Sequence, residues 1–113
     1  MNDVERKNFD EPDETYPFER GRADTVTVGA HMLTRAVFEP GWRWSESLGP
    51  TAGTEYCEKP HFAYIVAGRG VNVWQDGTRI EFSPGDVVQL PPGHEAWTVG
   101  DEPLVFLDLQ RLM

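Results

Sequence analysis

Two histidines and two glutamates are the residues of this sequence best suited to acid–base chemistry. His61 and His94 carry imidazoles that titrate near neutral pH. Glu46 or Glu55 would orient or oppose such an imidazole if the fold brought them together. Proton transfer is therefore within the chemical reach of this chain, provided that its structural elements place a carboxylate beside a histidine.

The sequence lacks the motifs of nucleotide-binding proteins and of serine hydrolases. Gly68-Arg69-Gly70 stands between strand-like segments, so no helix follows it whose N-terminus would bind a phosphate. No nucleophile elbow and no Ser-His-Asp order of residues is present. These patterns disfavour a hydrolase or a nucleotide-binding protein.

The charge balance narrows the possible partners. The 113 residues contain 19 acidic side chains against 10 lysines and arginines, a formal net charge of −9. Such a chain repels phosphate backbones and anionic lipids, so we expect neither a nucleic acid nor a membrane as partner. The single cysteine cannot form an internal disulfide, and neither a membrane-length apolar stretch nor a signal pattern is present. We expect a soluble, cytoplasmic protein that binds a small molecule.

The N-terminal region differs from the rest of the chain. Residues 1–24 are rich in acids and show no apolar periodicity, although they include Phe9, Tyr16 and Phe18. Three aromatic side chains favour an arm docked on the domain or on a neighbouring subunit over a wholly disordered tail. We therefore divide the chain into an acidic N-terminal arm, residues 1–24, extended or partly disordered, and a β domain, residues 25–113.

From Thr25 onward, short strand-like segments alternate with Gly and Pro turns. Helical periodicity never extends beyond one or two turns. The predicted strands are residues 25–28, 32–38, 42–46, 62–67, 71–75, 79–82, 87–90, 95–99 and 104–109. So many short strands cannot bury their faces as one flat sheet, and we predict an all-β barrel or two-sheet jelly roll with an interior.

Two connections in this pattern are informative. Asp76-Gly77 is the strongest turn signal, because a two-residue type I′ loop needs positive φ at both positions and Asp-Gly tolerates it. We expect a tight hairpin there. Residues 48–59 carry Gly, Pro and Thr without alternation and form the longest expected loop of the domain, a feature that is often functional.

The alternation of side chains along a strand indicates which residues enter the barrel. On one expected strand, Trp42, Trp44 and Glu46 share a face and would form a ligand platform, or the tryptophans would belong to the core. Trp97 lies out of phase with His94, so only one of the two needs to point inward. Our candidate ligand-binding residues are Trp44, Glu46, His94 and Trp97.

The order of turns resembles the cupin superfamily, whose members are small double-stranded β-helix barrels. That family's second motif, a Gly, five residues and Pro-x-Gly, is present from Gly85 to Gly93 as GDVVQLPPG. The segment from Tyr64 to Gly70, YIVAGRG, is similar to the end of the first motif. The resemblance covers residues 41–96, about half of the chain, and implies a jelly-roll barrel for residues 25–113.

The metal-binding positions depart from the cupin pattern. Counting back from the glycine turn places His61 at the usual Glu position, Cys57 at the second His and Glu55 at the first. The ligand histidine of the second motif is replaced by Ala96, and His94 is the candidate to supply that imidazole. The resemblance thus implies a divalent transition metal held by these residues. Cysteine with histidine suits zinc, iron or copper better than magnesium or calcium.

Two functions stay open from the sequence. In the first, the chain is an enzyme whose metal serves as Lewis acid or oxygen-activating centre for a small organic substrate. In the second, it is a non-catalytic ligand-binding or sensing module without metal, in which Cys57 acts as a small apolar group. Asp108 interrupts an apolar run and is interpreted as a structural hydrogen-bonding group, with a position in the pocket as the less favoured alternative. The resemblance and the aromatic residues of the arm also predict a homodimer.

Overall fold

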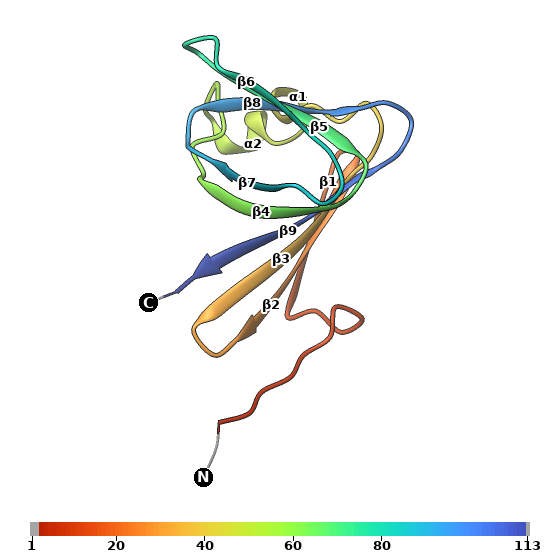
Figure 1. The fold of residues 1–113 in the computed structure, drawn as a ribbon, viewed down its shortest axis with the longest axis vertical. Helices are drawn as coiled ribbons and strands as arrows, with labels where there is room; N and C mark the ends of the chain where they lie inside the picture. The colour runs from red at the N-terminus through yellow and green to blue at the C-terminus, as the bar shows by residue number, and fades with distance from the viewer. Residues whose placement is uncertain (1–2, 113) are drawn as a thin grey trace.

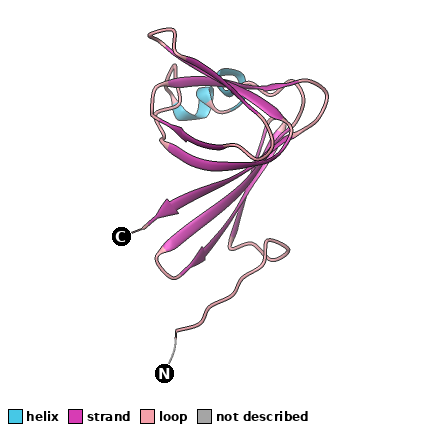
Figure 2. Ribbon diagram, in the orientation of Figure 1, coloured by secondary structure: helices cyan, strands magenta, loops and turns pink. Residues whose placement is uncertain are grey.

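The computed structural model describes residues 3–112 and folds them into two antiparallel β-sheets (Figures 1 and 2). The larger sheet has the order β1-β2-β3-β9-β4-β7 and the smaller one β6-β5-β8, which confirms the predicted jelly-roll barrel. The strands are β1 Glu14–Phe18, β2 Gly21–Val28, β3 His31–Phe38, β4 His61–Ala67, β5 Arg69–Trp74, β6 Arg79–Phe82, β7 Val87–Leu90, β8 His94–Val99 and β9 Leu104–Arg111.

Two one-turn helices, α1 Trp44–Ser47 and α2 Gly49–Ala52, precede β4 in the chain. Helix α1 contacts β8, so the helices lie on the side of the smaller sheet (Figure 2). Neither helix of the described range has the length and apolar character needed to cross a membrane.

Strand β4 shows how side-chain alternation builds the barrel interior. Ala63 and Ile65 are buried, and Ile65 pairs with Phe106 of β9 in the core. Phe62 and Tyr64 point to the other face and are about half exposed. The side chains of this strand therefore alternate between the barrel interior and its outer surface.

The N-terminal residues form part of the larger sheet. Strand β1 pairs with β2, and β2 runs through the boundary that we expected after residue 24. Two of the three aromatic side chains of this region contact the chain's own domain. Phe18 packs on Phe38 with 5.7 Å between ring centroids, and the Arg35 guanidinium lies 4.8 Å from the ring centroid of Phe9. Strands β2, β3 and β9 project beyond the barrel (Figure 1).

A buried carboxylate explains why an acidic segment still forms strands. Asp24 is 3% exposed and accepts hydrogen bonds from the Thr15 hydroxyl and from the side chains of Arg22 and Arg35. Burial favours the neutral form of Asp24, but these hydrogen bonds and the positive charges outweigh it and hold its pKa below the usual value. The acidic composition of the segment therefore does not prevent strand formation.

The expected strand 42–46 is wrong, because helix α1 begins at Trp44. Trp44 and Leu48 lie four residues apart and both line the barrel interior, whereas Glu46 is exposed. A run of alternating tryptophans fits the period of a strand over so short a stretch, yet the Trp44–Leu48 spacing fits a helix equally well.

A tight turn joins β5 and β6 at Asp76-Gly77, as predicted, but its geometry differs from type I′. Gly77 has a φ of 91°, and within residues 3–112 Arg20 is the only non-glycine residue with positive φ, so Asp76 does not adopt it. The Gly77 amide donates to the Trp74 carbonyl, and Asp76 Oδ1 accepts from the Thr78 amide at 2.9 Å. The aspartate side chain therefore stabilises the turn through a hydrogen bond to the backbone.

Candidate metal and ligand site

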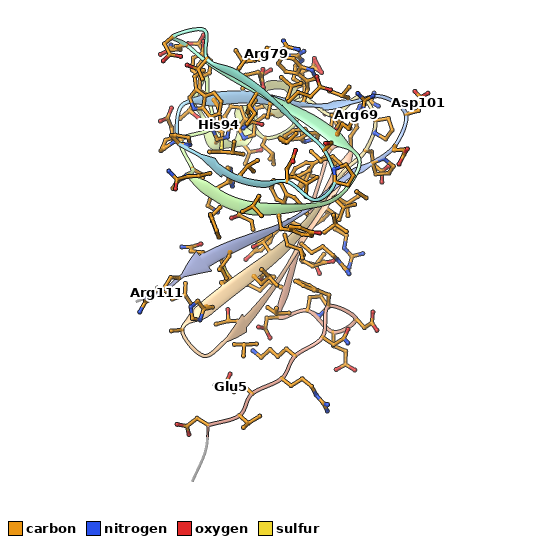
Figure 3. The ribbon with its side chains drawn as sticks, in the orientation of Figure 1. Glu5, Arg69, Arg79, His94, Asp101 and Arg111 are labelled. Carbon is orange, nitrogen blue, oxygen red and sulfur yellow. The ribbon has the colours of Figure 1, made fainter. Side chains whose placement is uncertain are left out.

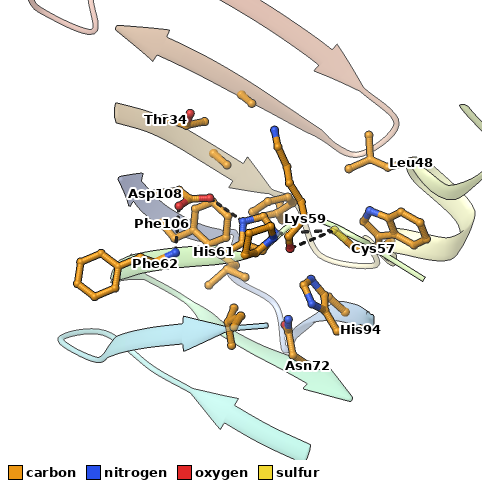
Figure 4. Close-up of a pocket in the computed structure, with 18 of the residues that line it drawn as sticks. Thr34, Leu48, Cys57, Lys59, His61, Phe62, Asn72, His94, Phe106 and Asp108 are labelled. Carbon is orange, nitrogen blue, oxygen red and sulfur yellow. Dashed lines mark hydrogen bonds and ion pairs between the residues drawn. The ribbon is translucent and has the colours of Figure 1, made fainter. Parts of the chain in front are cut away.

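A cavity of about 570 Å³ occupies the barrel interior (Figure 4). Its apolar wall consists mainly of Phe38, Trp42, Trp44, Phe82, Leu90, Leu104 and Phe106. At one end of the barrel the lining residues, such as Phe82 and Leu104, are buried. At the other end Lys59 and Gln89 are exposed, so the cavity opens where β4 begins and β9 ends.

Three potential metal ligands converge on this cavity. Cys57, His61 and His94 each offer one ligand atom, and these atoms all lie within 4.8 Å of one another. Cys57 Sγ is 3.8 Å from His61 Nε2, and the two imidazole rings are 5.3 Å apart. Cys57 belongs to the loop before β4, where its amide donates to the His94 carbonyl. That backbone bridge fixes the thiol next to the start of β8.

Hydrogen bonds orient both imidazoles of this cluster. His61 Nδ1 lies 2.6 Å from Asp108 Oδ2, and His94 Nδ1 lies 2.8 Å from the Pro91 carbonyl oxygen. A carbonyl only accepts, so His94 carries a proton on Nδ1, and Nε2 remains for contacts within the cluster. The Asp108 carboxylate selects the same tautomer of neutral His61. Proteins orient metal-ligating histidines by this kind of contact.

The cluster also stabilises the thiolate. Burial raises the pKa of the Cys57 thiol, but hydrogen bonds with His61 and His94 outweigh burial and lower the pKa to about 6. Burial likewise favours neutral His61, yet Asp108 and Cys57 raise its pKa to about 9. At neutral pH the pair is therefore a thiolate beside an imidazolium, and the thiolate is the form that binds metals.

The structure separates Glu55 from the other predicted ligands. Glu55 is exposed and lines a groove on the outside of the barrel, whereas Cys57 is buried. Side chains two residues apart share a face only along a regular strand, and this loop pairs with β8 at Cys57 alone. His94 does join Cys57 and His61, because β8 begins at His94, one residue earlier than expected.

The four candidate ligand-binding residues are likewise divided. His94 and Trp44 are buried and line the cavity, whereas Glu46 is exposed and does not line it. Trp97 touches both the cavity and the outer groove. The guanidinium groups of Arg43 and Arg79 lie over its ring, 4.4 Å and 5.4 Å from the centroid. Figure 3 shows His94 within the barrel and Arg79 at its outer edge.

The sequence prediction missed one residue of the cavity, Asn72, and gave another, Asp108, only a structural role. Asp108 lines the cavity and holds His61, in addition to accepting the Phe62 amide at 3.2 Å. Asn72 lines the cavity from β5. No local signal identifies Asn72, because an amide between two valines in a strand is the ordinary pattern of a polar side chain that faces solvent.

Comparison with known proteins agrees with the barrel fold described above. The Cupin domain family matches residues 46–110. No curated protein sequence matches this chain.

Three solved structures illustrate the structural similarity. Oxalate decarboxylase of Lactobacillus farciminis, solved as a formate complex, is 22% identical with a TM-score of 0.61 over 85% of this chain. The match covers only 30% of that enzyme. A polyketide cyclase of Streptomyces resistomycificus is 18% identical with a TM-score of 0.67, over 97% of this chain and 80% of the cyclase. A cupin-like protein of Thermotoga maritima is 18% identical with a TM-score of 0.57, over 100% and 83% of the two chains.

Proposed function

The chain belongs to the cupin family, and from that premise we propose that its barrel binds a small organic molecule beside a transition metal held by Cys57, His61 and His94. The observation that carries the proposal is the convergence of one thiol and two imidazoles, within 4.8 Å, on the wall of a largely apolar cavity. Small-molecule sites combine apolar walls with a few convergent polar groups in this way.

The donor set fits a transition metal. One thiolate and two imidazoles suit zinc, iron or copper, and three protein ligands leave a coordination position for another molecule. Tetrahedral zinc, with bonds of about 2.0–2.3 Å, separates its donors by roughly 3–4 Å. The present spread of up to 4.8 Å therefore requires only small rotations of the side chains.

The residues around the cluster have separate tasks. Asp108 holds the His61 ring, the Pro91 carbonyl holds the His94 ring, and both leave Nε2 directed away from these contacts. The aromatic wall excludes water from the inner part of the cavity. A metal bound by the cluster would supply Lewis-acid or oxygen-activating chemistry to an organic substrate.

The metal content of the purified protein tests this proposal. Protein prepared without chelators should carry stoichiometric metal. After metal removal, added Co²⁺ should produce the near-ultraviolet charge-transfer band of a thiolate ligand. The double variant Cys57→Ala, His61→Ala should lose both signals, and Glu55→Ala, outside the cluster, should keep both. Absence of metal from the wild type, together with a melting temperature that Zn²⁺ does not change, would contradict metal binding.

A metal-free binding module is the second candidate function. The observation in its favour is that Asp108 and Cys57 already occupy both ring nitrogens of His61, which satisfies the imidazole without an ion. The two candidates differ in the effect of chelator on ligand binding. Unchanged binding of an apolar probe after complete metal removal would favour the module, and lost binding would favour the metal centre.

We also propose that the chain forms a homodimer. Phe9 and Phe18 already contact their own domain, so the case rests on the outer face of β4 and β7. There Phe62, Tyr64 and Val87 are 50%, 47% and 62% exposed, and Tyr64 is the register partner of Val87. Exposed apolar patches of this kind mark protein interfaces. Small-angle scattering at micromolar concentration should give a dimer mass, which Tyr64→Glu should reduce; a monomer mass for the wild type would refute the dimer.

A further inference from the structure

Asn72 is a buried polar residue of the cavity whose side-chain amide is directed into the open space. The residue is only 3% exposed and lines the cavity. No hydrogen bond joins its amide to any residue in the range 3–112, although the nearby polar side chains of His61 and His94 are both bonded. Figure 4 shows the amide pointing from β5 toward the cavity, next to His94.

Among residues 3–112 the fully buried side-chain polar atom without a partner is Trp42 Nε1, which also lines the cavity, whereas the Asn72 amide reaches the open space of the cavity. A bound molecule with a polar group at this depth can therefore pair with the Asn72 amide, which an apolar side chain of the same shape could not offer. Both the Nδ2 donor and the Oδ1 acceptor are available for such a group.

The strand register gives the depth of Asn72 in the cavity. On the paired strands β5 and β8, Trp74 lies opposite His94 near the open end, and Gly70 lies opposite Thr98 at the closed end. Asn72 lies between these levels, opposite Ala96. The small alanine side chain, which also lines the cavity, leaves space beside the amide. The amide thus stands between the metal-ligand cluster and the apolar closed end.

We propose that Asn72 recognises the hydroxyl or carbonyl oxygen of a ring-sized, otherwise apolar ligand. The ring packs toward the closed end, against the apolar side chains of Phe82, Leu104 and Phe106, which line the cavity there. The oxygen then lies at the level of the amide, where it accepts from Nδ2 or donates to Oδ1. The inference rests on the proposed binding of a small molecule in the barrel and does not require the metal.

Two probes of nearly equal shape test this role. The molecules 2-naphthol and 2-methylnaphthalene share a ring system and differ by a hydroxyl in place of a methyl group. Dissociation constants from NMR titration of the metal-depleted protein should favour 2-naphthol by about tenfold in the wild type, the value of one net hydrogen bond in a buried site. Asn72→Leu should abolish this preference by weakening 2-naphthol alone, with 2-methylnaphthalene bound at least as tightly as before.

Control variants separate recognition by Asn72 from a general change in the polarity of the cavity. Gln89→Leu makes the same amide-to-apolar change at the exposed mouth and should leave the preference intact. If Asn72→Leu does not fold, the same two probes are titrated against Asn72→Ser, which keeps a polar group of smaller size. A preference that persists in Asn72→Leu, or no preference in the wild type, overturns the role of Asn72 and leaves ligand binding standing. Failure of both probes to bind the wild type, both after metal depletion and after reloading with Zn²⁺, overturns the proposed binding function itself.

Discussion

The barrel cavity and the outer groove enclose similar space, about 570 Å³ and about 610 Å³, but differ in the state of their polar groups. In the groove Glu95 lies 3.6 Å from Arg43, the guanidinium groups of Arg43 and Arg79 cover the Trp97 ring, and Glu55 is exposed. In the cavity the Asn72 amide is buried and has no hydrogen-bond partner within residues 3–112. Unused bonding capacity, and not volume, therefore distinguishes the site.

The same strand supplies residues to both regions. Along β8, His94 and Ala96 line the cavity, Glu95 lines the groove, and Trp97 touches both. Neighbouring residues of one strand can therefore be exchanged to compare the two environments directly.

The largest contrast is expected between His94→Ala and Glu95→Ala. Loss of a side chain that binds the metal directly should weaken metal binding by more than about 100-fold. Removal of a residue that only orients such a ligand through a hydrogen bond already costs about 10–100-fold. Glu95 lies outside the cluster, so its removal should change the affinity little. Competition with a chromophoric chelator measures both affinities, with circular dichroism as the test of folding. Equal metal affinity in the two variants would contradict the assignment of the metal site to the cavity.

A second pair of variants compares core and surface on β4. Ile65 is 0% exposed, and Ile65→Ala should lower the free energy of unfolding by about 2–5 kcal/mol through lost burial and a new cavity. Val66 is 45% exposed, and Val66→Ala should change it by about 0.5 kcal/mol. Urea denaturation provides both values. Similar losses at the two positions would show that the outer face of β4 is also buried, as in a dimer.

Asp108→Asn probes the orientation of the cluster without removing a ligand. The amide keeps the shape of the carboxylate but cannot favour the same His61 tautomer by charge, so metal affinity should fall by about 10–100-fold. Chelator competition again measures the loss. If the affinity is unchanged, the His61–Asp108 contact has no part in metal binding.

Outside the cavity, Asp24 tests the stabilising effect of paired charges. Its lowered pKa means that the folded chain favours the carboxylate, so its contribution is complete above about pH 4 and is lost as the pH falls through the folded-state value. Asp24→Asn should therefore reduce the free energy of unfolding by about 1–2 kcal/mol at pH 7. The difference from the wild type should shrink in acid. A difference that is the same at pH 3 and pH 7 would mean that the charge of Asp24 is not what stabilises the strands.

Turns could be predicted from the sequence because they depend on local chemistry. Gly85 and Gly93 have φ values of 94° and 90°, in the left-handed region that favours glycine. Because the backbone of these turns requires glycine, the second cupin motif can be recognised in the sequence. The predicted strand 42–46 is wrong because the pattern of a five-residue segment fits a strand and a helix equally well.

The candidate site was only partly predictable because long-range pairing builds it. The register of β4 with β9, in which Ala63 pairs with Asp108, brings the Asp108 carboxylate to His61 across 47 positions of the chain. Nothing local to Asp108 indicates this contact. Glu55 was assigned by counting from a motif, and the irregular loop that carries it turns its side chain outward.

Anomalous X-ray scattering from crystals prepared with Zn²⁺ tests whether the cavity cluster binds a metal. One strong peak is expected within the barrel, at bonding distance from Cys57 Sγ and from Nε2 of both His61 and His94. The matched crystal of the double variant Cys57→Ala, His61→Ala should lack that peak. Anomalous peaks confined to exposed carboxylates such as Glu55, with none in the barrel, would contradict the account.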